Sequence, residues 1–196
     1  NIFNGCSLLT TIPELNTVSV TNMSNMFANC FNLTTVPLLN TAAVTTMAGM
    51  FSNCRSLTTI PLFNTALVTD MTNIFGFCSS LINIPLLNTA ACTVFDNMFS
   101  YCFRLTTIPL LNTTAAQSAA NMFANCYSLT TIPALNFASI SFDYLLDSAF
   151  QGCFNLSRIS ITGIKVSFSV AGCKLSSAAL NLLYTNLATV TGQTIT

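Results

Sequence analysis

The chain repeats itself every 24 residues, and this period constrains its fold more than any other feature of the sequence. Residues 25–48 are NMFANCFNLTTVPLLNTAAVTTMA, and residues 49–72 are GMFSNCRSLTTIPLFNTALVTDMT. The same frame fits the preceding unit and the two that follow, and a copy with three extra residues spans 121–147. A chain with this period is expected to form a solenoid in which each coil contacts only its neighbours.

Several residue types recur at one fixed position of the unit, and a degenerate further copy begins at Ser148. All the prolines share one position, and phenylalanine recurs in the same way. The cysteine column is Cys6, Cys30, Cys54, Cys78, Cys102, Cys126 and Cys153. The asparagine column is Asn16, Asn40, Asn64, Asn88, Asn112 and Asn136. We expect both to be structural ladders: the cysteines pack as small buried side chains, and stacked asparagine amides satisfy backbone groups inside the turn.

Each unit is expected to fold into a short helix followed by a short strand. A helix is predicted near residues 21–31, because apolar residues there follow a helical stripe: Val20, Met23, Phe27 and Cys30. Residues 33–38 are rich in β-branched side chains and predict a strand. The proline in each strand removes a backbone donor, so few hydrogen bonds should join neighbouring strands there. The fold class is therefore an α/β repeat solenoid, leucine-rich-repeat-like, with about seven 24-residue coils over residues 1–160, a parallel sheet on one face and short helices on the other.

Residues 161–196 depart from the repeat and are expected to form a C-terminal cap of one helix and a β segment. Ser176 or Ser177 can cap the helix, whose apolar face would hold Leu180, Leu183, Tyr184 and Leu187. A terminal coil must cover an exposed apolar end, and an amphipathic helix suits that role. No equivalent cap precedes Asn1, so we expect further sequence or another subunit to cover the first coil.

Charge is scarce throughout the chain. Charged residues make up 5% of it, far below the roughly 25% of ordinary soluble domains, and the formal net charge is zero. Nucleic-acid binding needs clustered positive charge, so no nucleic-acid partner is expected. Thr, Ser and Asn interrupt every apolar stretch well before about 18 residues, so no membrane span is predicted.

The sequence carries no pattern of an enzyme or of a metal site. It has no histidine, the commonest general base, and its five acidic residues lie at scattered positions. Asp143 and Asp147 are four residues apart, as expected for a solvated helix turn. The cysteines occur once per coil, in a line rather than in the CxxC pairs typical of zinc sites, and their odd total of nine argues against complete disulfide pairing. We therefore expect no catalytic residue, no metal and no cofactor.

Three sets of residues are candidates for a contact face. The first is an outward threonine column, in which Asn83 replaces one member: Thr11, Thr35, Thr59, Thr107 and Thr131. The second is a leucine column, either buried by a sharp turn after proline or exposed as an apolar stripe: Leu38, Leu62, Leu86 and Leu110. The third is an aromatic group near the cysteine turn: Tyr101, Phe103 and Tyr127.

The unit MFxxCxxLTTIPLLNTxxVTxM resembles the BspA-like leucine-rich repeats of bacterial surface proteins and mycoplasma lipoproteins. Residues 22–36, NMSNMFANCFNLTTV, carry the resemblance most clearly, and it covers about residues 1–160. Similar repeats occur in phage tail and fibre proteins, and the C-terminal segment LSSAALNLLYTNLATVTGQTIT is similar to segments that close repeat arrays there. The proline column and the near absence of charge depart from the family pattern.

The resemblance implies attachment or recognition and brings no catalytic motif. The leading hypothesis is a non-enzymatic recognition or adhesion module on an extracellular, cell or virion surface, with a protein or glycan as partner. The alternative is a structural component of a virion tail or fibre, where coils contact neighbouring copies or other virion subunits. A flat threonine array is also typical of ice-binding solenoids, which is the minor alternative.

Overall fold

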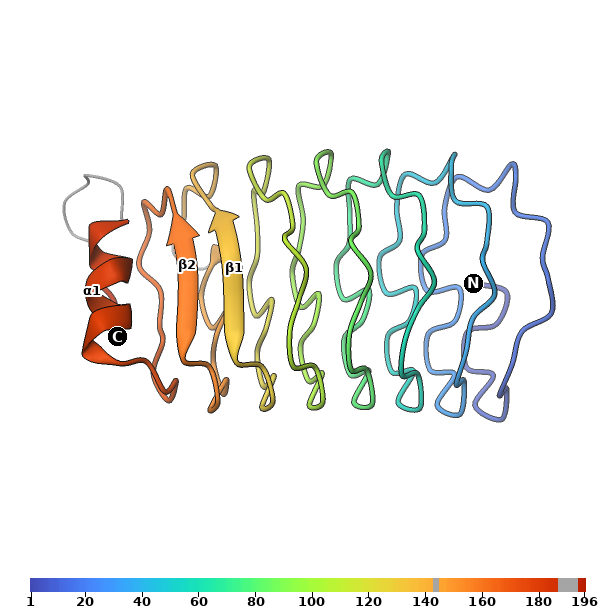
Figure 1. The fold of residues 1–196 in the computed structure, drawn as a ribbon. Coiled ribbons are helices and arrows are strands. Elements are labelled where there is room, and N and C mark those ends of the chain that lie inside the picture. The colour runs from blue at the N-terminus through green and yellow to red at the C-terminus, as the bar shows by residue number, and fades with distance from the viewer. Residues whose placement is uncertain (143–144, 187–193) are drawn as a thin grey trace.

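The protein is a stack of coils along one axis, seen in a computed structural model that describes residues 1–142, 145–186 and 194–196. The coils stand in a nearly straight row, and the two termini lie at opposite ends of it (Figure 1). Three regular elements are present in these ranges: β1 (Thr131–Asn136), β2 (Arg158–Thr162) and α1 (Ser177–Thr185). Most coils are therefore built from turns and extended segments.

The segment predicted as a helix, residues 21–31, is a run of consecutive turns, so that prediction is wrong. Its N–H groups alternate between two kinds of acceptor. Those of Asn25 and Phe27 donate to carbonyl groups of the next coil, at 2.8 and 2.9 Å. The intervening N–H groups of Met26 and Ala28 donate to carbonyls three residues back in the same coil. We call this segment and its equivalents in other coils the turn spiral.

Left-handed backbone conformations explain why the turn spiral cannot be an α-helix. Two positions per coil have φ between 53° and 79°, which most L-residues avoid and which Gly and Asn tolerate. One position is occupied by Asn25, Gly49, Asn73, Asn97, Asn121 and Ser148. The other is occupied by Gly5, Asn29, Asn53, Phe77, Tyr101, Asn125 and Gly152. These residues turn alternate N–H groups toward the neighbouring coil instead of along a helix axis.

The turn spiral nevertheless buries side chains at helical spacing, because Met23, Met26, Phe27 and Cys30 all point into the core. The phenylalanine rings stack from coil to coil, from Phe3 to Phe150, with centroid separations of 5.5 to 5.9 Å. Each stacked pair stabilises the folded state by roughly 0.5–1.5 kcal/mol beyond the effect of burying the rings. One continuous aromatic column therefore forms the centre of the solenoid.

On the opposite side, the extended segments make few backbone hydrogen bonds between coils. The Thr34 N–H donates to the Thr10 carbonyl at 3.0 Å, and later coils repeat about one such bond each. A strand pair forms only between β1 and β2 among the described residues, in parallel register with an irregularity between Ile132 and Leu135. The expected sheet along the whole face is thus reduced to two strands. Ser160 stands at the proline position in β2, so this strand keeps an N–H group at every residue.

The C-terminal end is covered by α1, which packs beside β2 (Figure 1). Ser176 is the N-cap, and its Oγ accepts a hydrogen bond from the Ala179 N–H at 3.2 Å. Leu183 is fully buried and Leu180 packs against the core, as predicted. Tyr184 is 57% exposed, so its predicted place on the apolar face is wrong. Two other expected residues, Leu187 of this face and Asp143, lie outside the described residues.

The backbone of Asn97 gives a test that separates the turn spiral from a helix, because φ there is 55°. Asn97→Ala should lower the free energy of unfolding by about 1 kcal/mol, since alanine resists the left-handed region. Asn97→Gly should change it by less than about 0.5 kcal/mol. Urea unfolding of both variants measures the difference. A helix would reverse the order, because alanine favours helices and glycine disfavours them.

Candidate functional site

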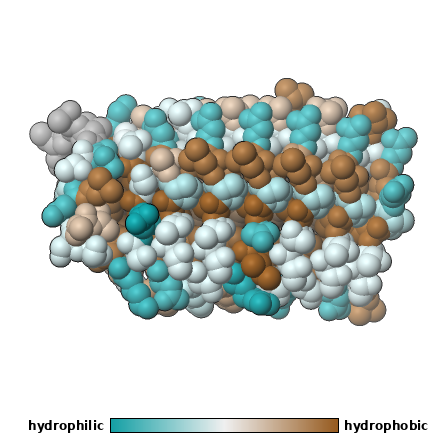
Figure 2. Space-filling model, viewed as in Figure 1, coloured by the Kyte–Doolittle hydropathy of each residue, from teal (hydrophilic) through white to brown (hydrophobic). Residues whose placement is uncertain are grey.

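The leucine column is exposed, and the residue that follows each of its leucines is buried. Of the two arrangements that the sequence allowed, buried column or exposed apolar stripe, the structure has the exposed stripe. Leu38, Leu62, Leu86 and Leu110 are 71%, 62%, 63% and 59% exposed. The next residue in each coil is buried: Leu39, Phe63, Leu87 and Leu111. Figure 2 shows a row of hydrophobic side chains along the solenoid on the face that carries β1 and β2. We call the four exposed side chains the leucine stripe.

The surroundings of the leucine stripe are uncharged over its length. The prolines, which are half-buried in most coils, lie one residue before it, and exposed asparagines lie two residues after it. The equivalent position is Glu14 in the first coil and Ala134 in β1, so a carboxylate stands beyond one end of the stripe only. The threonine column lies on the same extended segments. Thr11, Thr35, Thr59 and Thr107 are exposed, and Thr131 is half-buried.

The cysteine column lies inside the solenoid except at its first member, the exposed Cys6. Each later thiol donates to a phenylalanine carbonyl of the preceding coil, as in Cys54 to Phe27 at 3.1 Å. The same contact recurs at 3.0–3.1 Å for Cys30, Cys78, Cys102, Cys126 and Cys153. Cys173 continues the series at 3.8 Å. The thiol is thus a hydrogen-bond donor between coils, a role that spacing alone did not reveal.

Burial makes these thiols hard to ionise. It raises the pKa of Cys78 to about 12 and that of Cys173 to about 11, from an ordinary 9.0. Burial, reinforced by the neighbouring Cys173 thiol, raises the pKa of Cys153 to about 12. All nine cysteines are free, and no three His, Cys, Asp or Glu side chains of the described residues converge on a point that could hold a metal ion. The buried thiols of the column are therefore held in the neutral form at neutral pH.

The asparagine side chains accept backbone hydrogen bonds inside the turns. Each Oδ1 accepts the N–H two residues later in its own turn, as from Ala42 to Asn40 at 3.1 Å, and most of these side chains are exposed. The links between coils come from the next residue, a threonine. The buried Thr41 hydroxyl donates to the Asn64 carbonyl at 2.8 Å, and four other threonines repeat the bond: Thr17, Thr65, Thr89 and Thr113. Sequence reasoning missed this threonine ladder, although its strict 24-residue recurrence was visible.

The aromatic candidates Tyr101, Phe103 and Tyr127 come together with two further rings, Phe77 and Phe154. Phe77 stacks on Tyr101 at 4.5 Å and Phe103 on Tyr127 at 4.9 Å. Tyr127 stacks on Phe154 at 5.4 Å. Tyr127 thus stacks with two rings, whereas the end rings Phe77 and Phe154 stay 41% and 52% exposed. Phe77 and Tyr101 adopt φ of 63° and 62°, a strained conformation that the stacking helps to offset.

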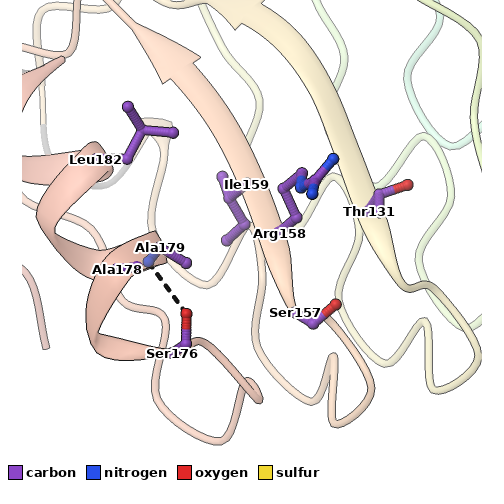
Figure 3. A pocket seen from close by; sticks show the side chains of 8 residues that line it. All are labelled: Thr131, Ser157, Arg158, Ile159, Ser176, Ala178, Ala179 and Leu182. Atoms are coloured by element: carbon purple, nitrogen blue, oxygen red, sulfur yellow. Dashed lines mark hydrogen bonds between the residues drawn. The ribbon is translucent and has the colours of Figure 1, made fainter.

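A hollow of about 490 Å³ lies between α1 and the strand pair (Figure 3). The side chain of Arg158 lies between β2 and β1 beside Thr131, and Leu182 and Ala179 approach from the helix (Figure 3). Among the described residues that line it, Arg158 is the only charged side chain. Its other described lining residues are small, hydroxyl or apolar side chains, which could provide contacts to a partner.

Over the part of the chain that the structure describes, no helix has the length and hydrophobicity needed to cross a lipid bilayer.

Comparison with known families identifies the repeat. The family described as "Mycoplasma protein of unknown function, DUF285" matches residues 1–104, 28–136 and 58–156, which together span most of the chain. The chain belongs to this family. The resemblance to mycoplasma-lipoprotein repeats predicted from the MFxxCxxL unit is therefore confirmed. No curated protein sequence matches this DUF285 chain.

Solved structures place the DUF285 chain among leucine-rich-repeat folds. A leucine-rich repeat protein of T. pallidum has a TM-score of 0.64 and 19% identity, over 89% of this chain and 81% of the other. A leucine-rich cell surface protein of Faecalibacterium prausnitzii is less similar, with a TM-score of 0.41 and 21% identity over 76% of this chain and 52% of the other. A leucine-rich repeat protein of Bacteroides ovatus has a TM-score of 0.35 and 14% identity, over 98% of this chain and 76% of the other. The first likeness shows a shared solenoid fold and nothing about a shared ligand.

The raised thiol pKa values predict that the protein loses stability at alkaline pH. Unfolded thiols ionise from about pH 9, whereas folded Cys78 stays neutral up to about pH 12, so stability present below pH 9 is lost as pH rises between these values. At pH 10 the Cys78 thiol alone should lower the free energy of unfolding by about 1.4 kcal/mol. Urea unfolding at pH 8 and pH 10 measures this. Between pH 8 and pH 10, the free energy of unfolding of Cys78→Ala should fall by about 1.4 kcal/mol less than that of wild type. Equal falls in the two proteins would contradict the effect of thiol burial.

Proposed function

We propose that the protein is a non-enzymatic recognition or adhesion module that binds a macromolecule through the face carrying the leucine stripe. The observation that carries the proposal is the exposure of four leucines in one row, each at least 59% exposed, on a rigid solenoid. Exposed apolar rows of this kind are typical of interaction surfaces. The partner is a protein or glycan, and the apolar character of the stripe favours a protein.

The chemistry of the remaining surface supports a binding role over catalysis. The chain has no histidine, and its buried thiols are held in the neutral form by burial. The aromatic rings at the cysteine turns and the hollow beside Arg158 provide further contact chemistry without acid–base pairs. An extracellular, cell-surface or virion location fits the uncharged Thr, Ser and Asn surface and the BspA-like repeat.

The second candidate is a structural part of a virion tail or fibre. Uniformity favours it, because one residue type fills the stripe in four consecutive coils, whereas a surface fitted to a particular ligand usually varies along its length. The ice-binding alternative has less support. The threonine column is interrupted by Asn83 and ends at Arg158, and a protruding leucine row lies on the same segments.

A matched pair of substitutions tests the proposed function. Leu62→Asp removes an apolar side chain from the stripe, and Leu67→Asp makes the same change at a leucine that is 54% exposed outside it. Wild type and both variants are applied to arrays of purified extracellular proteins and glycans. We expect at least one ligand that binds wild type and L67D with similar affinity. It should bind L62D at least about tenfold more weakly, as for a central interface residue. Equal binding by all three proteins, or the absence of any ligand, would overturn it.

A further inference from the structure

We infer that the hollow between α1 and the strand pair binds a carboxylate that carries an apolar group, as the C-terminal residue of a peptide does. None of the stripe leucines is among the described residues that line this hollow, so the inference is independent of the function proposed for the stripe. Three features of the hollow carry the inference: a cationic side, an apolar side that faces it, and a rigid frame of ligand size.

The cationic side of the hollow is Arg158. This residue stands where the threonine column would continue, and its side chain lies beside Thr131, its register partner in β1 (Figure 3). None of the described acidic residues lines the hollow: Glu14, Asp70, Asp96 and Asp147. A guanidinium group binds a carboxylate through two parallel hydrogen bonds, which gives both affinity and orientation. The charge of the hollow therefore matches a ligand with a carboxylate group.

The side of the hollow that faces Arg158 is apolar and comes from α1. Leu182 and Ala179 approach from the helix (Figure 3), and Ala178 also lines the hollow. Leu182 is 49% exposed, whereas the adjacent Leu183 is fully buried in the core. An apolar group placed against Leu182 would remove this surface from water, which favours binding. The ligand should therefore present an apolar group on the side away from its carboxylate.

Hydroxyl groups between these two sides suit a peptide bond. The Ser176 Oγ accepts the Ala179 N–H at 3.2 Å (Figure 3), and a hydroxyl that accepts one hydrogen bond can still donate another. The Ser157 Oγ donates to the Thr130 carbonyl at 3.2 Å, and its lone pairs can accept a further hydrogen bond. One donor and one acceptor are what the carbonyl and N–H of a peptide bond require. This match favours the end of a peptide over a simple aliphatic acid.

The frame of the hollow is the most regular part of the described structure. The three regular elements β1, β2 and α1 all border it. The parallel pairing of Thr131 with Arg158 holds one side, and the Ser176 cap holds the first turn of the helix. Side chains on strands and helices keep their geometry better than side chains on loops. The volume of about 490 Å³ lies within the range of about 300–1,000 Å³ that is common for ligand pockets.

NMR titration of isotope-labelled protein with N-acetyl-leucine tests the site. This compound represents the C-terminal residue of a peptide, and its small size predicts a dissociation constant of about 1 mM. The signals of the Arg158 Nε–H and of the Thr131 and Ala179 backbone amides should shift. N-acetyl-leucinamide has the same apolar group and peptide bond but no carboxylate. It should bind at least about tenfold more weakly, because the charge-assisted hydrogen bonds are lost.

Substitutions on the two sides of the hollow test the assignment from the protein. Arg158→Gln should raise the dissociation constant of N-acetyl-leucine at least about tenfold, because it removes the cation. Leu182→Ser should raise it by about threefold to tenfold, because it removes apolar contact area. Arg104→Gln is the matched control: Arg104 is also exposed, it does not line the hollow, and this variant should bind as wild type does. Circular dichroism and thermal unfolding show that each variant is folded.

Several results would overturn the inference. These are equal binding of N-acetyl-leucine and N-acetyl-leucinamide, unchanged binding by R158Q, and the absence of any shift at several times the expected dissociation constant. Glucuronate carries a carboxylate on a sugar without the apolar group, and tighter binding of glucuronate than of N-acetyl-leucine would overturn the choice of an apolar ligand.

A further compound separates the two sources of this chemistry. Isocaproate has the apolar group and carboxylate of leucine without the peptide bond. Weaker binding of isocaproate than of N-acetyl-leucine supports a peptide end, and equal binding would overturn that assignment. Leu62→Asp, in the leucine stripe, should leave all these titrations unchanged, so that failure of this site and failure of the proposed function can be told apart.

Discussion

The structure depends on the hydrogen bonds that the turn spiral makes to the next coil. Alternate N–H groups leave their own coil and reach a carbonyl of the neighbour, as from Phe51 to Ile74 at 3.0 Å. These bonds hold successive coils in register, and register places each phenylalanine ring on the next. The thiol and threonine donors add further links between the same coils. Regular strands can therefore be almost absent, because the opposite side of the solenoid is not required to hold the coils together.

Much of this fold could be predicted from the sequence, since a strict period specifies which residues are stacked. The cap at Ser176 and the burial of Leu183 followed from local patterns. The helix prediction failed because the turn spiral buries the same positions as a helix: Met23, Phe27 and Cys30 are inside in either case. The asparagines and glycines at the two left-handed positions, such as Asn25 and Asn29, were the available signal against a helix.

The candidate site was less accessible to prediction. Leu38 and Leu39 are adjacent and equally apolar, so their sequence could not say which of them faces solvent; the path of the chain after Pro37 decides it. The aromatic group extends to Phe77 and Phe154 only because the coils place residues 24 and 27 positions apart in contact. The hollow beside Arg158 depends on where α1 packs, which no local pattern specifies. What the sequence did indicate was the uncharged, repetitive surface on which the proposed contacts rest.

Scalar coupling across hydrogen bonds, measured by NMR, tests the turn spiral most directly because it identifies the acceptor of each N–H. Coupling is expected between the Phe51 amide nitrogen and the Ile74 carbonyl carbon, and likewise between Asn53 and Gly76. Coupling from Phe51 to the carbonyl of Met47, four residues back, would show an α-helix instead. That result would contradict the mechanism by which the coils are held in register.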